Sequence, residues 1–510
     1  MTRGPGRPAQ ILGDASDLDA PAVDLRTRVA WLARVSRCAS ADPAVSKQVA
    51  FAQRMREAGV GASSTKVSLW ENAHQPMTLA VLAGYEQVLG LPSGQLQSTC
   101  EGLGRSIFSS GRSPLQRARA LGGGQQLLDT VYDAVSHQAT TGGDWFGLTS
   151  YWDHVPGAMV PVAIVRQLTA TLLGEMVRAC GVAYVTRYQA LCHLADHPIY
   201  AQVLVDTVLD FVAVPGVEPV IDAISLLGEG LAEQTAPELL TLGADPVGRV
   251  RAGATAALAN QIRMGSFPHT LRPRLRQLIG ALCAGSVDDA RLARRLIVRL
   301  PESEREEGLA VLRRRTTPPS QAPSPRRTLP TLVQVDTSRY ERAAQEATGL
   351  PRDPVLRRLL HEVHVHDRIE LRHHACLLLM ASPYRTAVAD VALTALREQP
   401  RTPAWAGAAI LLSYLATEEH AADLLALTGH ERDDVRQAAL TALTHACGVP
   451  PEVDLLAAST LGGVPDAAVR YAAGMAAHPA LGEWARAETI PTDIRERCRW
   501  WQRHGAAVRA

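Results

Sequence analysis

The ten residues from Ser63 to Asn72 carry side chains of the kinds that bind nucleic acid. The segment reads Ser-Ser-Thr-Lys-Val-Ser-Leu-Trp-Glu-Asn, and the chain has only two lysines and two asparagines in total. Hydroxyl groups bond phosphate oxygens, whereas Lys66 and Asn72 can also bond base edges in the major groove. If these residues form a helix that enters a major groove, those that would face DNA are Ser63, Ser64, Thr65, Lys66, Ser68, Leu69 and Asn72.

Histidines at 361, 364, 366, 373 and 374 suggest metal binding, but their spacing argues against it. The run is not H-E-x-x-H, and His361 and His366 are five positions apart, off the face that two helical zinc ligands share. The signatures of phosphate-binding loops, nucleophile elbows and dinucleotide-binding turns do not occur in the sequence. We therefore predict no metal site, no cofactor and no catalytic residue, and a protein that is not an enzyme.

A longer motif surrounds the 63–72 segment. A Gly-Val turn at Gly59 precedes Val67-Ser-Leu-Trp-Glu71, and Pro76 follows five positions after the glutamate. Next comes a Leu-x-x-Leu-Ala helix that ends in Leu-Gly-Leu-Pro at Pro92. Over residues 44–96 this pattern resembles the helix-turn-helix of Cro and the phage repressors, the xenobiotic-response-element family.

The resemblance implies a sequence-specific transcriptional regulator whose recognition helix, about residues 63–72, lies in the major groove of double-stranded DNA. Proteins with this motif usually pair two copies about one helical turn apart, so we expect a homodimer. Val67 and Trp70 should point inward, and Glu71 should brace the neighbouring helix. Together with Pro76 these residues form the expected structural core of the motif.

Four helices are predicted around the motif. Asp24 caps a helix over residues 25–37, and a second helix spans residues 45–58 and ends at Gly59. A cap within residues 62–65 opens the third helix, and Thr78 caps a fourth that reaches Leu89. Residues 23–104 are therefore the expected DNA-binding domain, preceded by a flexible N-terminus over residues 1–22.

A Val-Arg-x-x-Ala pattern recurs downstream at a spacing near 32 residues. Its anchor alanines are Ala190, Ala223, Ala254, Ala375, Ala409, Ala439 and Ala473. Small residues let helices approach closely when repeats stack, and no strand-like alternation appears. Residues 180–300 and 355–480 resemble HEAT repeats, and an irregular helical bundle is the alternative. The repeat arginines, expected to bond backbone of neighbouring repeats, are Arg251, Arg372, Arg436 and Arg470.

The predicted fold is therefore all-α, with an N-terminal helix-turn-helix domain followed by a HEAT-like α-solenoid. Residues 105–179 form a helical connector, 180–313 the first repeat block, 314–330 a Pro/Ser-rich linker, and 331–510 the second block. An aromatic cluster in the connector comprises Trp145, Phe146, Tyr151 and Trp152. We expect it to pack between domains, with a ligand site or a dimer surface as alternatives.

Charge is distributed unevenly although the net charge is only +1. Residues 1–119 contain 14 Arg or Lys against 9 Asp or Glu, which gives about +5 there and −4 in the rest. This asymmetry favours DNA binding by the first quarter and predicts that a fragment of residues 1–119 binds alone. Eight scattered cysteines, no secretory signal and no apolar run of 18 residues predict a cytoplasmic, nucleoid-associated protein without a membrane span.

Three functions remain open on the sequence. The first is a DNA-binding regulator whose solenoid senses a signal, dimerises, or binds a protein or small-molecule partner. The second is a non-enzymatic scaffold whose helix-turn-helix docks proteins. The third is a DNA-repair protein with a basic concave solenoid, which the net-acidic remainder of the chain disfavours.

An excess of Arg, Ala, Gly and Pro over Lys and Asn indicates a GC-rich bacterial genome.

Overall fold

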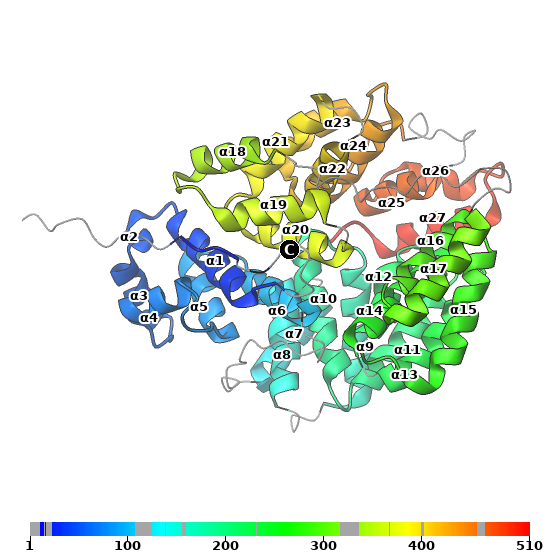
Figure 1. Ribbon diagram of the computed structural model, residues 1–510, viewed down its shortest axis with the longest axis horizontal. Coiled ribbons are helices and arrows are strands. Elements are labelled where there is room, and N and C mark those ends of the chain that lie inside the picture. The colour runs from blue at the N-terminus through cyan, green and yellow to red at the C-terminus, as the bar shows by residue number, and fades with distance from the viewer. Residues whose placement is uncertain are drawn as a thin grey trace, which may run out of the picture. The chain divides into compact units, whose positions relative to one another are not determined.

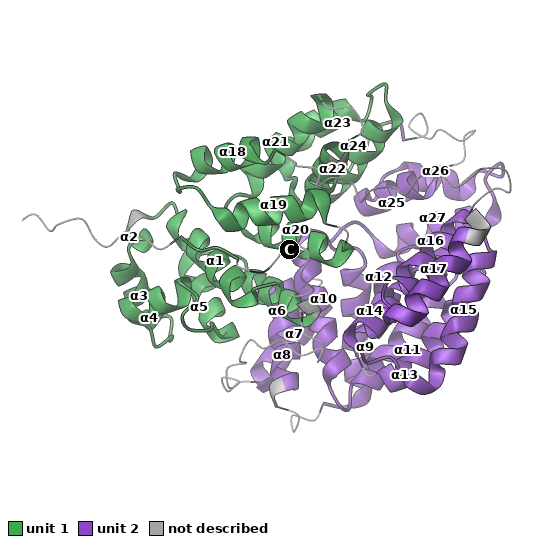
Figure 2. Ribbon diagram, in the orientation of Figure 1, with its two compact units in different colours: residues 1–107, 113–119, 334–453 green, residues 108–112, 120–333, 454–510 purple. Residues whose placement is uncertain are grey.

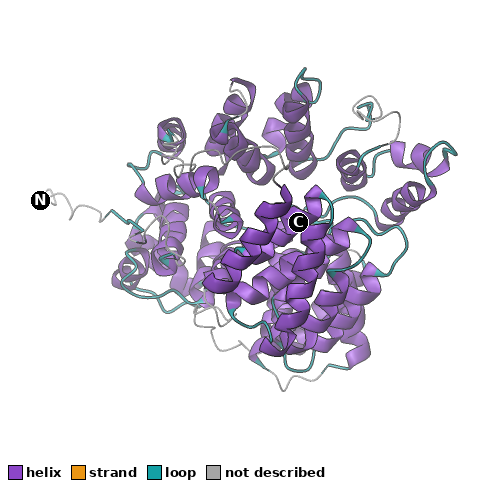
Figure 3. Cartoon of the chain, turned by 45° about the vertical axis from the view of Figure 1, so that its right-hand side comes forward, coloured by secondary structure: helices purple, strands orange, loops and turns teal. Residues whose placement is uncertain are grey.

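The computed structural model describes residues 11–14, 16, 23–107, 124–137, 139–155, 160–230, 232–316, 336–366, 368–398, 402–455 and 465–509. Every regular element over these residues is a helix, as Figure 3 shows. One isolated bridge, between Ala179 and Val508, is the only β pairing in the part of the chain just given. The predicted all-α class is therefore confirmed. The linker predicted at 314–330 lies outside the described residues from 317 onward.

The chain forms two compact units, each built from segments far apart in the sequence (Figure 2). Unit 1 combines residues 1–107, 113–119 and 334–453, and unit 2 combines residues 108–112, 120–333 and 454–510. The second block predicted at 331–510 is thus divided between the units. Its helices up to residue 446 belong to unit 1, and those from residue 467 belong to unit 2.

Unit 1 begins with six helices, labelled in Figure 1. They are α1 (Leu25–Cys38), α2 (Pro43–Ser46), α3 (Gln48–Glu57), α4 (Ser64–Glu71), α5 (Leu79–Leu89) and α6 (Gln95–Ile107). Asp24 accepts a hydrogen bond from the Thr27 amide, and Thr78 accepts one from the Val81 amide, at 3.1 and 3.2 Å. Both caps were predicted and are confirmed, because these side chains satisfy amides that lack helical partners.

The prediction of one continuous helix over residues 45–58 is wrong, because Lys47 divides this segment into α2 and α3. Lys47 is extended, with φ −86° and ψ 123°, and the Ser46 carbonyl accepts a hydrogen bond from Arg37. Val45 and Phe51 are both buried. In one continuous helix these two side chains would point about 120° apart, because six positions turn about 600°. The break lets both reach the same core.

Helical hairpins follow in unit 1. They comprise α18 (Ser338–Thr348), α19 (Pro354–Val365), α20 (Ile369–Ala381), α21 (Arg385–Glu398), α22 (Pro403–Leu415), η3 (Glu418–His420), α23 (Ala421–Leu427) and α24 (Asp433–Ala446). α19 packs against α20 and α22, α21 against α22, and α22 against α24. α6 packs against α20, so the six N-terminal helices and the hairpins share one unit.

Unit 2 stacks its helices in two rows. The first segment holds α7 (Gly124–Ser136), α8 (Gly142–His154), α9 (Val162–Met176), α10 (Gly181–Asp196), α11 (Ala201–Val212), α12 (Val220–Ser225), η1 (Leu226–Gly228), α13 (Ala232–Leu242), α14 (Gly248–Met264), η2 (His269–Leu271), α15 (Arg272–Ala284), α16 (Val287–Ile297) and α17 (Glu302–Thr316). α12, α14 and α16 pack in succession, as do α13, α15 and α17. Each hairpin covers the apolar face of the next, as the repeat pattern predicts.

Three C-terminal helices complete unit 2, namely α25 (Ala467–Ala476), α26 (Ala480–Arg486) and α27 (Thr492–His504). The buried Glu218 carboxylate, just before α12, joins them to the first segment. Arg470 Nη2 lies 2.8 Å from Glu218 Oε1, and Trp501 Nε1 donates to Oε2 at 3.0 Å. A charge buried in this way is tolerated because it is paired and hydrogen-bonded.

The anchor alanines mark the helix contacts at six of the seven predicted positions. Ala190, Ala223, Ala254, Ala375, Ala439 and Ala473 have no exposed surface. Ala409 is half-buried, and its neighbour Ala408 is fully buried instead. In an alanine-rich stretch, Ala-Ala pairs make the register ambiguous by one residue, which explains this error.

The repeat arginines bond backbone carbonyls, but these carbonyls do not belong to neighbouring repeats as predicted. Arg251 Nη1 donates to the Asp245 carbonyl at 2.7 Å, and Arg436 Nη1 donates to the His430 carbonyl at 2.8 Å. Each arginine therefore closes the turn before its own helix, six residues back, rather than a neighbouring repeat. Arg251 also reaches the next hairpin, because its Nη2 lies 2.9 Å from Asp289 Oδ1 on α16.

Candidate nucleic-acid interface

A tight turn positions α4 against α3, and the two helices lie side by side (Figure 1). Gly59 has φ +83°, a left-handed conformation that favours glycine, and it follows the last residues of α3 as predicted. Arg56 Nη1 donates to the Ala62 carbonyl at 2.9 Å. Ser63 then caps α4 by accepting a hydrogen bond from the Lys66 amide at 3.1 Å. The start of α4 is thus fixed by local bonds.

The inner face of α4 is held by a buried polar cluster around Glu71, which is 1% exposed. Its carboxylate accepts from Arg37 Nε at 2.5 Å and Arg37 Nη2 at 2.7 Å. It also accepts from the Tyr85 hydroxyl at 2.9 Å and from Gln48 Nε2 at 3.2 Å. Glu71 therefore ties α4 to α1, α3 and α5 at once.

Electrostatics within this cluster follow from burial. Burial opposes the charge on Arg37, but the hydrogen bonds and negative charge of Glu71 outweigh it and raise the pKa of Arg37. Burial and the same carboxylate raise the pKa of Tyr85 well above its usual value. Arg37 and Glu71 are thus a charged pair, and Tyr85 is a neutral hydrogen-bond donor to it.

The two apolar residues assigned to the core do lie there. Val67 has no exposed surface and Trp70 is 5% exposed. Pro76, the remaining residue of the expected structural core of the motif, has an exposed side chain. Met77, which is 2% exposed, fills the interior instead, while Pro76 lies in the turn before the Thr78 cap.

The outer face of α4 holds the residues predicted to contact DNA. Ser63, Thr65, Lys66 and Leu69 are exposed, with Leu69 at 36%, and Ser64 and Ser68 are half-buried. Lys66 Nζ donates to the Gly61 carbonyl at 2.9 Å, which holds the amine over the first turn of its helix. An ammonium has three donors, so two hydrogens are left for other acceptors.

Asn72 is placed differently from the other predicted contacts. It is the C-cap of α4, and its Nδ2 donates to the Ser68 carbonyl at 2.7 Å and to Ser68 Oγ at 3.2 Å. Its Oδ1 accepts from Arg34 Nη1 at 3.4 Å. The half-buried amide thus closes the end of the helix, and the exposed predicted residues gather toward its N-terminal turn.

Sequence reasoning missed the partners of Glu71, above all Arg37 and Tyr85. A partial signal does exist, because α1 carries four arginines among its apolar residues, and two of them, Arg28 and Arg37, are buried. Buried arginines in a helix that is covered on several sides require charged partners. The identity of those partners depends on which helices surround α1, which the spacing of residues in one helix does not give.

The aromatic cluster is an interior part of unit 2. Trp145, Phe146 and Trp152 are each at most 3% exposed. Trp145 Nε1 donates to Glu175 at 2.8 Å, and the Trp152 ring meets the Tyr200 ring edge-on at 5.6 Å. The cluster therefore packs inside unit 2 rather than between domains as expected, and its three buried members leave no surface for a ligand or a second copy, while Tyr151 is half-buried.

The histidines of α19 and α20 bond to their own surroundings. His364 Nδ1 lies 2.8 Å from the Leu360 carbonyl, and His373 Nδ1 lies 2.8 Å from the Tyr414 hydroxyl. Over the described residues, no three His, Cys, Asp or Glu side chains are placed to share a metal ion.

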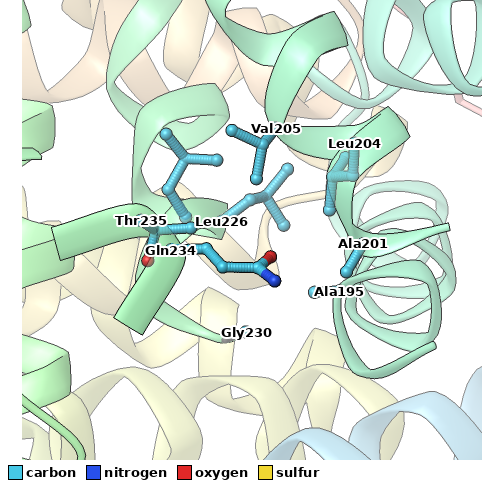
Figure 4. A pocket seen from close by; sticks show the side chains of 9 residues that line it. Ala195, Ala201, Leu204, Val205, Leu226, Gly230, Gln234 and Thr235 are labelled. Carbon is cyan, nitrogen blue, oxygen red and sulfur yellow. The ribbon is translucent and has the colours of Figure 1, made fainter. Parts of the chain in front are cut away.

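Unit 2 contains a small pocket between α11, η1 and α13 (Figure 4). Apolar residues of α11 and η1 line it, together with Gln234 and Thr235 of α13. Its empty space is about 230 Å³, part of it open to solvent. Pockets that enclose small ligands usually measure about 300–1,000 Å³, so this one provides no site of that kind.

Within the described residues, no helix is both long and apolar enough to cross a membrane.

Comparison with known proteins adds little. No protein family matches the sequence, and no curated protein is significantly similar to it. Several solved structures do match. One of them comes from a study of tubulin recruitment and assembly by microtubule polymerases with tumor overexpressed gene (TOG) domain arrays. It shares 12% identity, and the match covers 81% of this chain and 97% of that chain with a TM-score of 0.26.

Proposed function

We propose that this protein is a non-enzymatic regulator that binds duplex DNA through the outer face of α4. The observation that carries the proposal is the division of α4 into two faces. Glu71 fixes the inner face through Arg37, while the N-terminal turn exposes Ser63, Thr65 and Lys66. A helix that reads a groove needs its orientation fixed and its donors exposed, and α4 has both.

Electrostatics support the same surface. Helix N-termini carry partial positive charge from unpaired amides and attract phosphate oxygens. Lys66 adds a full charge there, and its amine already lies over this turn. Ser63 and Thr65 supply hydroxyl donors beside it. In the proposed complex, Lys66 bonds a phosphate or a guanine edge, and the hydroxyls bond backbone phosphates.

Titration of the full chain with a mixed-sequence 30-base-pair duplex at several salt concentrations tests the proposal. Each phosphate contact contributes about −0.9 to the slope of log affinity against log salt concentration. Lys66→Ala should weaken binding and make the slope shallower by about one contact. Arg274→Ala, which removes an exposed arginine of α15 in unit 2, is the matched control and should leave both quantities unchanged. Loss of affinity in the control but not in Lys66→Ala would refute the assignment.

One recognition helix reads only a few base pairs, so we also propose that two copies bind together. Each base-pair contact discriminates by about 1–3 kcal/mol, which is too little for one helix to find a site in a genome. Since the aromatic cluster is buried, the dimer contacts must lie elsewhere. Light scattering of the full chain with and without duplex measures this directly. A monomer under both conditions would rule out the paired arrangement.

A second candidate function is protein docking by the same helix, with the stacked hairpins as a scaffold. The observation in its favour is Leu69, an apolar side chain 36% exposed in the middle of the outer face. Leu69→Arg separates the two functions. On a DNA-facing surface the added charge should raise affinity for the mixed duplex and steepen the salt dependence. On a docking surface it should leave duplex binding at the level of the parent chain.

A further inference from the structure

α1 has buried arginines on opposite sides. Arg28 and Arg37 are nine positions apart, which is about 900° of helical rotation and places them half a turn apart. Eleven of the fourteen residues of α1 are buried. Arg37 faces α4 and pairs with Glu71, as described above. α1 is therefore a central helix of unit 1 that contacts a different partner on each side.

On the other side of α1, Arg28 pairs with Glu362 of α19. Arg28 Nη1 donates to Glu362 Oε2 at 2.9 Å, and Nη2 donates to Oε1 at 2.5 Å. Nε donates to Asp14 Oδ2 at 2.8 Å, and all three side chains have no exposed surface. Removing one partner from a buried pair of this geometry leaves an uncompensated charge, so the two helices are strongly tied.

Trp31, about one helical turn after Arg28, makes a second contact between α1 and α19. Its Nε1 donates to Asp353 Oδ2 at 2.6 Å. Asp353 is the N-cap of α19, and its Oδ1 accepts from the Val355 and Leu356 amides at 3.0 and 3.1 Å. Tyr384 adds a hydroxyl donor to Asp353 Oδ2 at 3.1 Å. The same carboxylate thus starts α19 and holds α1.

We infer that α1 couples the α18–α24 hairpins to α4, which makes Glu362 a positioning residue for the surface proposed to bind DNA. The chain of contacts runs from Glu362 to Arg28, along α1 to Arg37, and from Arg37 to Glu71. Every member is buried and every link is a bidentate ion pair or a helix. A ligand or substitution that shifts Glu362 relative to α1 should therefore change DNA affinity without touching DNA. This inference rests on the proposed function for its affinity readout only.

Glu362→Gln in the full chain is the test, because it keeps the shape of the side chain and removes its charge. Glu341→Gln is the matched control. Glu341 of α18 also holds an arginine bidentately, with Arg357 Nε and Nη2 at 2.7 and 2.6 Å, but this pair joins α18 to α19 and does not involve α1. Two quantities are compared with the parent chain, namely affinity for the mixed duplex with its salt slope, and amide hydrogen exchange of residues 67–71.

Glu362→Gln should weaken duplex binding about five-fold or more, at the lower end of typical coupling between sites. The salt slope should not change, because the number of phosphate contacts is the same. The amides of residues 67–71 should exchange faster, and Glu341→Gln should behave like the parent. If exchange rises in α1 and α19 while α4 and the affinity stay at parental values, the coupling does not exist.

Two further outcomes are distinguishable. If Glu362→Gln does not fold, Trp31→Phe removes the hydrogen bond to Asp353 and the pyrrole part of the indole while keeping a six-membered aromatic ring, and the same changes are expected in smaller size. Unchanged exchange at residues 67–71 in that variant would also refute the coupling. If the parent chain does not bind duplex while Glu362→Gln still speeds exchange in α4, the proposed function fails and the coupling stands.

Discussion

Gly84 of α5 lies so close to Val60 that a Cβ atom on Gly84 would come within 2.6 Å of Val60 Cγ2. The same atom would lie 2.9 Å from Met55 Cε. Real Cβ atoms do not approach neighbours this closely, so the absence of a side chain at Gly84 lets α5 lie against α3 and the turn that precedes α4. That turn sets where α4 begins.

Gly84→Ala should therefore destabilise unit 1 although alanine favours helices. Overpacking a filled core costs about 1–3 kcal/mol, more than the gain of about 1 kcal/mol from helix propensity. Gly61→Ala is the control, because nothing lies within 4 Å of its Cβ position. Thermal unfolding followed by circular dichroism measures both. An equal midpoint for the two variants would show that α5 has room to move.

Trp70→Ala should destabilise the fold, whereas Lys66→Ala should leave the fold intact and weaken DNA binding. Trp70 is 5% exposed, and truncating a buried tryptophan costs about 3–5 kcal/mol. Lys66 is exposed, so its loss should leave the unfolding midpoint within experimental error and weaken only DNA binding. Circular dichroism and duplex titration of each variant give the two quantities. Parental melting of Trp70→Ala would mean that the faces of α4 are assigned wrongly.

A fragment of residues 1–119 should not form the native N-terminal helices, contrary to the expectation from charge alone. It lacks α19, so Arg28 would lose Glu362 and Trp31 would lose Asp353. Unpaired buried charges and bare apolar surface are both costly. We expect poor solubility or a non-cooperative thermal transition, where the full chain unfolds cooperatively. A soluble fragment with sharp melting and parental duplex affinity would contradict this.

Acidification should destabilise unit 1 through His373. Burial lowers the pKa of His373 to about 4, whereas an unfolded histidine titrates near 6.5. The unfolded state therefore takes up the proton first, and stability falls between about pH 6.5 and 4 by at most about 1.4 kcal/mol per pH unit. His373→Gln should flatten this part of the profile, and His74→Gln, at an exposed position, should not. The unfolding midpoints of the parent chain and both variants, measured at pH 7 and pH 5, show whether the loss of stability depends on His373.

Local features of the fold were predictable because their causes are local. The caps at Asp24 and Thr78 and the glycine turn after α3 follow from residue types that satisfy helix ends. The inward direction of Val67 and Trp70 follows from helical periodicity. The break at Lys47 was missed because it depends on burying Val45 and Phe51 together, which is a property of the assembled core.

Long-range partners were not predictable for a related reason. Arg28 and Glu362 are 334 residues apart, and neither belongs to a motif. α1 is covered on several sides, and its two buried arginines, Arg28 and Arg37, pair with carboxylates on different helices. The sequence therefore identified α4 as the candidate surface but gave no sign that the hairpins over residues 338–446 would support it.

The interleaving of the two units also determines when each can fold during synthesis. The helices α1–α6 leave the ribosome long before α19, so Arg28 and Trp31 must wait for partners more than 320 residues downstream. In unit 2, Glu218 waits in the same way for Arg470 and Trp501. Unit 1 can be completed only after its last helix, α24, has been made, and unit 2 only after α27, since each takes its last helices from the final third of the sequence. Apolar surface that later becomes interior is thus exposed on the nascent chain, which makes this protein a natural client for chaperones that bind emerging polypeptides.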